Sequence, residues 1–110
     1  MTELVKSSAD VNIANNNGTT ALLNAVLNED ETSVRLLLSR GAKVDVRNKA
    51  GYTPITSAAA HGHESILRLL INAGGNINLP TKSGSTALAL ATLNGHSSCV
   101  LLLERAQADH

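Results

Sequence analysis

The sequence has almost no aromatic residues. Its 110 residues include one tyrosine, Tyr52, and neither Phe nor Trp, so aromatic residues make up 1% of the chain. Surfaces that bind bases or sugars by stacking need aromatic faces. The scarcity of aromatic residues therefore argues against nucleic-acid-stacking and lectin-like functions, and it predicts a core built from Leu, Ile, Val and Ala.

Cysteine, an excess of either charge and long apolar runs are missing as well. The single Cys99 rules out an internal disulfide framework and a Cys-rich zinc site. Lys+Arg and Asp+Glu number 9 each, and a net charge of +0 provides no general attraction to nucleic acid or to an anionic membrane. The first residues, "MTELVKSS", lack the apolar core of a signal peptide, and no apolar run approaches membrane-spanning length. We therefore expect a cytoplasmic protein with no membrane insertion, and a nuclear location stays open as the alternative.

The chain repeats itself with a period of 33 residues, which separates Gly18, Gly51 and Gly84. Aligned on these glycines, it reads "NGTTALLNAVLNEDETSVRLLLSRGAKVDV", "AGYTPITSAAAHGHESILRLLINAGGNINL" and "SGSTALALATLNGHSSCVLLLERAQAD". The preceding "ELVKSSADVNI" matches the end of a repeat. We predict a single domain over residues 1–110, with a partial repeat over 1–15 and repeats over 16–48, 49–81 and 82–110.

Each repeat predicts two helices and a connecting loop. A threonine two positions after the glycine suits a helix N-cap, and an Ala/Leu-rich segment follows to about residues 28, 61 and 94. A second helix with a leucine-rich stripe follows, and Gly41 and Gly74 end it in the first two repeats. The connections "AKVDVRNKAG" and "GNINLPTKSG" alternate apolar and polar residues, as an extended hairpin does.

The recurring "G-x-T-[PA]-[LI]-x-x-A", "G-H", "L-L" and "G-A-x-V-[DN]" at this period resemble the ankyrin repeat, over residues 4–110. The resemblance implies an all-α repeat solenoid of stacked helix-turn-helix units joined by β-hairpin-like loops. The family's histidine after Thr-Pro-Leu is replaced by Leu23, Thr56 and Ala89, so its usual hydrogen-bond link between repeats is absent or rebuilt.

The two ends of the repeat array depart from the pattern. The third repeat has Gln107 in place of the terminal glycine and Glu104 at an apolar position, and polar changes of this kind suit the end of a stack. At the other end, Leu4 and Val5 have no first helix to pack on. We therefore expect the chain to be an excised segment or a short product of a longer array.

The string "HGHE", residues 61–64, poses the question of catalysis or metal binding. Gly62 and His63 fall on the "GH" of the repeat and recur as Gly95 and His96, which favours a helix start over a ligand cluster. His61 occupies a position that varies between repeats. Cys99 lies three residues after His96, but it aligns with an inward apolar position, which favours a buried structural thiol over a nucleophile. We predict no enzymatic activity, no cofactor and no metal site.

The family resemblance implies that another protein binds on the concave side, at the hairpin tips and the inner faces of the first helices. Carried over position by position, these sites are Asn16, Asn17, Thr19, Lys49, Ala50, Tyr52, Lys82, Ser83 and Ser85 at the tips, and Leu27, Asn28, Ala60, His61, Leu93 and Asn94 on the first helices. Tyr52 is the strongest candidate, because tyrosine is enriched in binding hot spots. Lys49 and Lys82 form a basic rim that suits an acidic or polar peptide. The alternative at each position is ordinary solvated surface.

Two further hypotheses remain open. The chain could act as a structural segment that self-associates or links domains through open apolar ends, at Leu4 and Val5 and around Leu101. The resemblance also implies that asparagines at the positions of Asn12 and Asn78, with Asp45 between them in register, can be hydroxylated. A turn residue that bonds its own backbone is the structural alternative for these asparagines.

Overall fold

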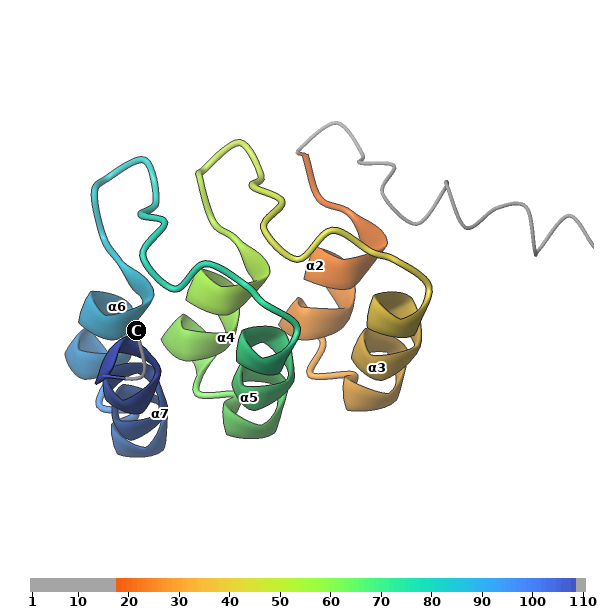
Figure 1. Cartoon of the computed structure of the whole chain (residues 1–110). Helices are drawn as coiled ribbons and strands as arrows, with labels where there is room; N and C mark the ends of the chain where they lie inside the picture. Colours follow the sequence, from red (N-terminus) through yellow and green to blue (C-terminus); the bar gives the residue numbers. More distant parts are fainter. Residues whose placement is uncertain (1–17, 109–110) are drawn as a thin grey trace, which may run out of the picture.

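A computed structural model describes residues 18–108, which form six helices arranged as three consecutive helix pairs (Figure 1). Their bounds are α2 Ala21–Leu27, α3 Glu31–Ser39, α4 Pro54–His61, α5 Glu64–Asn72, α6 Ala87–Leu93 and α7 Ser97–Ala108. No strand occurs in this part of the chain. The predicted all-α repeat architecture is confirmed.

Threonine side chains start all three first helices, as the sequence predicts. Thr20, Thr53 and Thr86 lie at the N-caps of α2, α4 and α6, where each side chain accepts a hydrogen bond from the backbone N–H three residues later. In α4, Pro54 occupies the first turn, and Thr56 Oγ1 accepts the backbone N–H of Thr53 at 2.7 Å. At the position where the family has histidine, the second repeat therefore has a threonine that completes a capping box.

The turn between the two helices of a pair requires a left-handed residue. Gly62 takes this conformation at the end of α4 with φ 75°. The equivalent residue of the first pair is Glu29, whose φ of 56° is the only positive value among the non-glycine residues between 18 and 108. A side chain in this conformation costs about 1–2 kcal/mol, so the first turn is strained relative to the second.

The core lies between the helix pairs and is aliphatic. Residues 54–59 of α4 are all buried, because α4 packs against α2 on one side and α6 on the other. The leucine-rich stripe of the second helices contributes Val34, Leu67, Leu70 and Leu103, each at most 1% exposed. Cys99 belongs to the same core, and burial, assisted by Glu64, raises the pKa of its thiol. This environment matches the predicted structural thiol.

The first helices form one row, the second helices form another, and the loops project as tips from one edge of the molecule (Figure 1). The loops between Gly41 and Thr53 and between Gly74 and Thr86 each end in a turn with two backbone hydrogen bonds. Within residues 18–108 no helix is both long and apolar enough to cross a membrane.

Candidate functional site

The sequence-predicted binding residues form two separate groups. One group lies at the loop tips and comprises Lys49, Ala50, Tyr52, Lys82, Ser83 and Ser85, while the other lies where the first helices end and comprises Leu27, Asn28, Ala60, His61, Leu93 and Asn94. The eight residues of α4 separate the groups by about 12 Å. Thr19 precedes α2 and is half-buried, whereas Asn16, Asn17, Asn12, Leu4 and Val5 lie outside the described residues.

A polar side chain organises the second tip from within. Asn48 Oδ1 accepts the backbone N–H groups of Ala50 and Tyr52, each at 3.0 Å. The backbone N–H of Asn48 donates in turn to the carbonyl oxygen of Tyr52 at 3.0 Å. Because all these bonds are local, the tip holds its conformation by itself.

The third tip uses hydroxyl groups for the same purpose. Thr81 Oγ1 accepts the backbone N–H of Ser85 at 3.3 Å and lies 3.0 Å from Ser83 Oγ. Thr81 is 4% exposed, while Ser83 is exposed and Ser85 half-buried. The third tip therefore presents hydroxyls that are already bonded to one another.

The second and third tips are joined to each other. Arg47 Nη2 donates to the carbonyl oxygen of Pro80 at 2.7 Å, and the backbone N–H of Lys82 donates to the carbonyl oxygen of Ala50 at 3.1 Å. A Cβ placed on Gly51 would lie 2.5 Å from the backbone nitrogen of Lys82, so only glycine allows this approach. The two tips therefore form one preformed surface, with Lys49 and Lys82 exposed and Tyr52 half-buried.

The second group of predicted residues centres on the carbonyl oxygen of Ala60. It accepts from Asn94 Nδ2 at 3.0 Å and lies 3.1 Å from His96 Nε2. His61 is exposed, but its Nδ1 lies 2.9 Å from the carbonyl oxygen of Ser57, and its ring stacks on His63 at a centroid distance of 5.6 Å. Two of the predicted binding residues, His61 and Asn94, thus also have contacts that hold the scaffold together.

His63 is placed differently from its counterpart His96. A Cβ on Gly62 would lie 2.6 Å from His96 Nδ1, so the His96 ring lies directly on that glycine. In the preceding repeat, the position of Gly62 is occupied by Glu29. His63 therefore faces a residue that already has a Cβ. A ring placed over Glu29 as His96 is placed over Gly62 would meet this Cβ. His63 faces the Glu29 carboxylate, with Nδ1 3.5 Å from Oε2.

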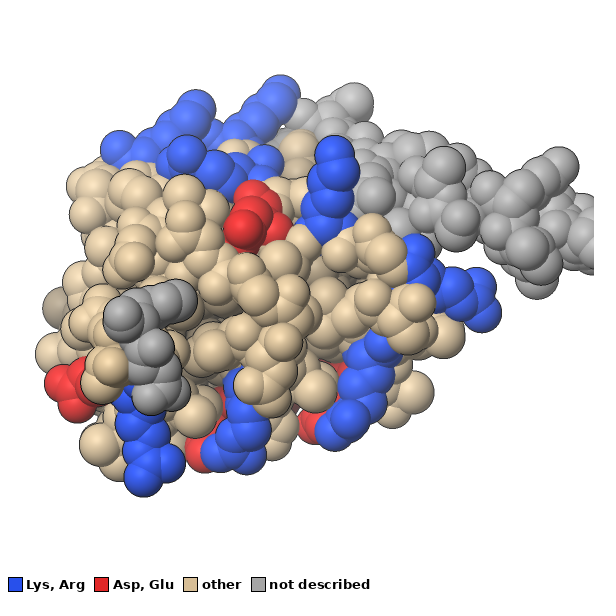
Figure 2. Space-filling model, viewed as in Figure 1, with Lys and Arg blue, Asp and Glu red and all other residues tan. Residues whose placement is uncertain are grey.

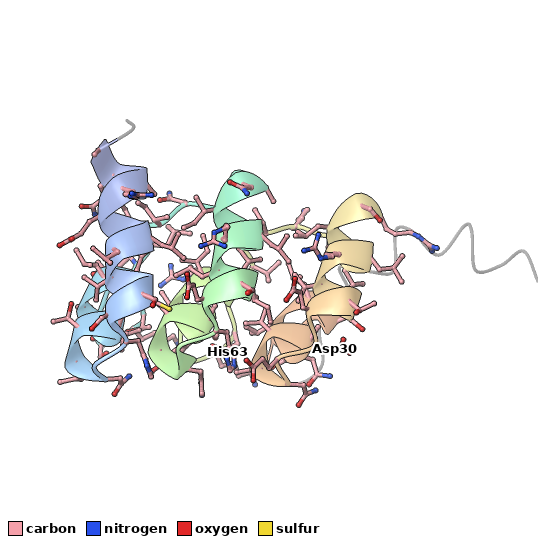
Figure 3. The ribbon with its side chains drawn as sticks, turned by 90° about the horizontal axis from the view of Figure 1, so that it is seen from below. Asp30 and His63 are labelled. Carbon is pink, nitrogen blue, oxygen red and sulfur yellow. The ribbon has the colours of Figure 1, made fainter. Side chains whose placement is uncertain are left out.

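This placement leaves the His63 Nε2 atom buried without a hydrogen-bond partner in the described part of the chain. Burial lowers the pKa of His63 below its ordinary value, the Glu29 carboxylate opposes that shift, and His61 and His96 add to it. Asp30, at the start of α3, accepts from the backbone N–H and the hydroxyl of Ser33, and these bonds lower the pKa of its carboxyl. Figure 3 shows Asp30 and His63 where the second helices begin.

The third repeat has two strongly exposed leucines. Leu93 is 80% exposed and Leu101 is 61% exposed, and Leu101 borders an open hollow of about 390 Å³ that Gly95 and Val100 also line. At the position of Leu101, the other second helices have arginines that pair with glutamates four residues earlier, Arg35 with Glu31 and Arg68 with Glu64. The third repeat has lost this ion pair and exposes a leucine in its place.

Arg47 and Asn48 build the tip surface but are not among the residues predicted from the sequence. Asn48 has a recognisable signal, because asparagine at the start of a turn accepts backbone N–H groups. Arg47 has a weaker signal: it occupies the same position in its repeat as Pro80 does in the next.

Asn78 is exposed, and its backbone N–H is bonded by the side chain of Asn76. Asn76 Oδ1 accepts the backbone N–H of Asn78 at 2.9 Å, and Asp45 Oδ1 accepts that of Asn76 at 2.8 Å. The side-chain oxygen of Asn78 lies 3.4 Å from Gln107 Nε2. The local turn at this site is therefore held by Asn76, while the Asn78 side chain contacts α7.

Between residues 18 and 108, no three His, Cys, Asp or Glu side chains gather in a way that could hold a metal ion. Comparison with protein families finds that residues 25–110 match a family described as ankyrin repeats, in three copies. No curated protein compared with the chain matches it.

Proposed function

The chain belongs to the ankyrin-repeat family, and we propose that it is a non-catalytic module that binds another protein. The binding surface consists of the second and third loop tips and the first helices beside them. One observation carries the proposal: Arg47 and the Lys82 backbone join two tips into one surface that is complete before binding. A cytoplasmic location is part of the proposal, and fractionation of cells that express the tagged chain tests it.

Preorganisation favours binding for a physical reason. A loop that becomes ordered on binding loses conformational entropy, which subtracts from affinity, whereas a loop already held by internal bonds does not. Tyr52 adds a large amphipathic side chain with little rotamer freedom to this rigid frame. Tyr52 is half-buried, so part of the residue is accessible to a partner.

Affinity capture with quantitative mass spectrometry tests this surface. A variant with Lys49→Ala, Tyr52→Ala and His61→Ala removes side chains from both groups of predicted residues. The matched control has Thr32→Ala, Ser65→Ala and Ser98→Ala, which change exposed residues at equivalent positions of α3, α5 and α7. We expect specific partners to be lost from the first variant and retained by the control. Undiminished capture of every partner by the first variant would show that the proposed surface is not the binding surface.

A second candidate function is self-association, and the exposed Leu93 and Leu101 favour it. Covering an apolar end of a repeat stack is favourable, because it removes apolar surface from water. Light scattering at high protein concentration tests this candidate, together with a Ser97→Glu, Leu101→Arg variant that restores the ion pair of the other repeats. A dimer that the variant disrupts supports self-association, and a strictly monomeric wild-type chain argues against it.

A further inference from the structure

We propose that the joined tips bind an acidic, extended segment of the partner protein, whose carboxylates pair with Lys49 and Lys82. This inference rests on the proposed protein-binding function and specifies the chemistry of the partner. It is carried by the separation of charge along the helix pairs and by the spacing of the two lysines.

Positive charge is concentrated at the tips. The loops over residues 41–53 and 74–86 contain four cations and one carboxylate, namely Lys43, Arg47, Lys49, Lys82 and Asp45. Figure 2 shows Lys and Arg side chains gathered along the edge of the molecule where the loops project. The Asp45 carboxylate is already engaged, because its Oδ1 accepts the backbone N–H of Asn76 at 2.8 Å.

Negative charge lies at the opposite end of the helix pairs. Asp30 caps α3, and Glu31 and Glu64 lie in the first turns of α3 and α5, where carboxylates complement the helix dipole. Glu31 and Glu64 are also paired with arginines on their own helices. No ion pair within the described residues involves Lys49 or Lys82. A chain with zero net charge thus has one edge that attracts anions.

The distance between the lysines indicates the kind of segment that fits. Lys49 and Lys82 occupy the same position in consecutive repeats. Because the axes of packed helices lie about 10 Å apart, we expect a similar distance between the two lysines. Three residues of extended chain also span about 10 Å. An extended segment with Asp or Glu at two positions three residues apart therefore places one carboxylate near each lysine.

A peptide fits this surface better than a nucleic acid does. A single-stranded nucleic acid is held by aromatic platforms as well as by cations, and Tyr52 is the only aromatic residue of the chain. The hydroxyls of Ser83 and Ser85, 3.5 Å apart in the same tip as Lys82, suit the backbone amides and carboxylates of a peptide.

The test uses selection from a random peptide display library on the intact chain. Enriched peptides are then measured by fluorescence anisotropy against the wild type and a Lys49→Gln, Lys82→Gln variant. Arg47 is left unchanged, because it holds the tips together. The matched control is Arg35→Gln, Arg68→Gln, which removes the same charge from the opposite end. A Tyr52→Ala variant and a labelled single-stranded RNA complete the set.

We expect enriched peptides with two acidic residues three positions apart. Their binding should weaken roughly tenfold in the lysine variant, stay unchanged in the arginine variant and fall as salt is raised. Enriched neutral or basic peptides that require Tyr52 but not the lysines would overturn the acidic preference and leave the protein-binding function standing. Peptides insensitive to all tip variants would overturn both proposals. RNA that binds more tightly than every selected peptide, through the same lysines, would also overturn the inference.

Discussion

The guanidinium of Arg47 donates from Nη2 to the carbonyl oxygen of Pro80 at 2.7 Å, and these two residues hold the same position in consecutive repeats. The bond links two neighbouring loops, together with the bond from the Lys82 backbone N–H to the Ala50 carbonyl oxygen. Arg47 Nε also donates to the carbonyl oxygen of Gly51 at 3.4 Å, within its own tip. The Arg47 side chain thus holds its own tip together and also binds it to the next tip.

Replacing Arg47 by leucine should loosen this connection. We expect the free energy of unfolding to fall by about 1 kcal/mol, because hydrogen bonds from a charged donor are lost at a site that water still reaches. Urea denaturation provides the measurement. Arg35→Leu serves as the control, since its exposed pair with Glu31 contributes only about 0.3–0.5 kcal/mol. Equal losses in the two variants would contradict a linking role for Arg47.

Gly62 and Gly95 provide a matched pair for the contact between repeats. Both are left-handed, with φ of 75° and 74°, but only Gly62 lies under a ring, that of His96. Gly95→Ala should cost about 1 kcal/mol for the backbone alone. Gly62→Ala should cost about 3 kcal/mol, because the new Cβ also displaces a ring held at the Ala60 carbonyl. Thermal and urea unfolding of both variants test the difference, and equal costs would show that the His96 contact adds nothing.

Glu29→Gly should stabilise the chain. The substitution removes the strain of a non-glycine residue at φ 56°, and glycine's greater freedom in the unfolded chain offsets part of the gain. We expect a net gain of about 0.5 kcal/mol, which raises the midpoint of thermal unfolding by a few degrees. Glu29→Gln is the control, because it removes the charge but keeps the Cβ. A gain in the glutamine variant as large as that in the glycine variant would assign the effect to charge.

His63 makes stability depend on pH. Its pKa in the folded chain lies below the ordinary 6.5, so the unfolded chain takes up the proton first as the pH falls. Its contribution is complete above about pH 6.5 and is lost on acidification toward the lowered folded pKa. Urea unfolding at about pH 7.5 and 5.5 should show a smaller acid-induced loss for His63→Gln than for the wild type. The same loss in both proteins would exclude His63 as the cause.

Much of the fold was predictable from the sequence because its signals are local and repeat. Threonine caps, helix-ending glycines and the leucine stripe recur at a fixed spacing, so each repeat supports the interpretation of the next. The placement of Cys99 followed from alignment with Ile66, since both face the same core.

The tip surface was only partly predictable, because its geometry depends on contacts between repeats. The Arg47–Pro80 bond requires two loops to lie side by side, and no spacing within one repeat indicates that. The same applies to His63, which faces the carboxylate of Glu29 across the repeat boundary. The variable position of His61 was visible in the alignment, but its bond to Ser57 and its stacking on His63 were not.

Site-specific photo-crosslinking shows whether a partner binds at the tips. A photoreactive phenylalanine analogue replaces Tyr52 in one chain and the exposed Ser65 of α5 in another. After illumination with captured partners, we expect a covalent partner adduct from position 52 and none from position 65. An adduct from position 65 alone would place the partner on the second helices and exclude the tips as the binding surface.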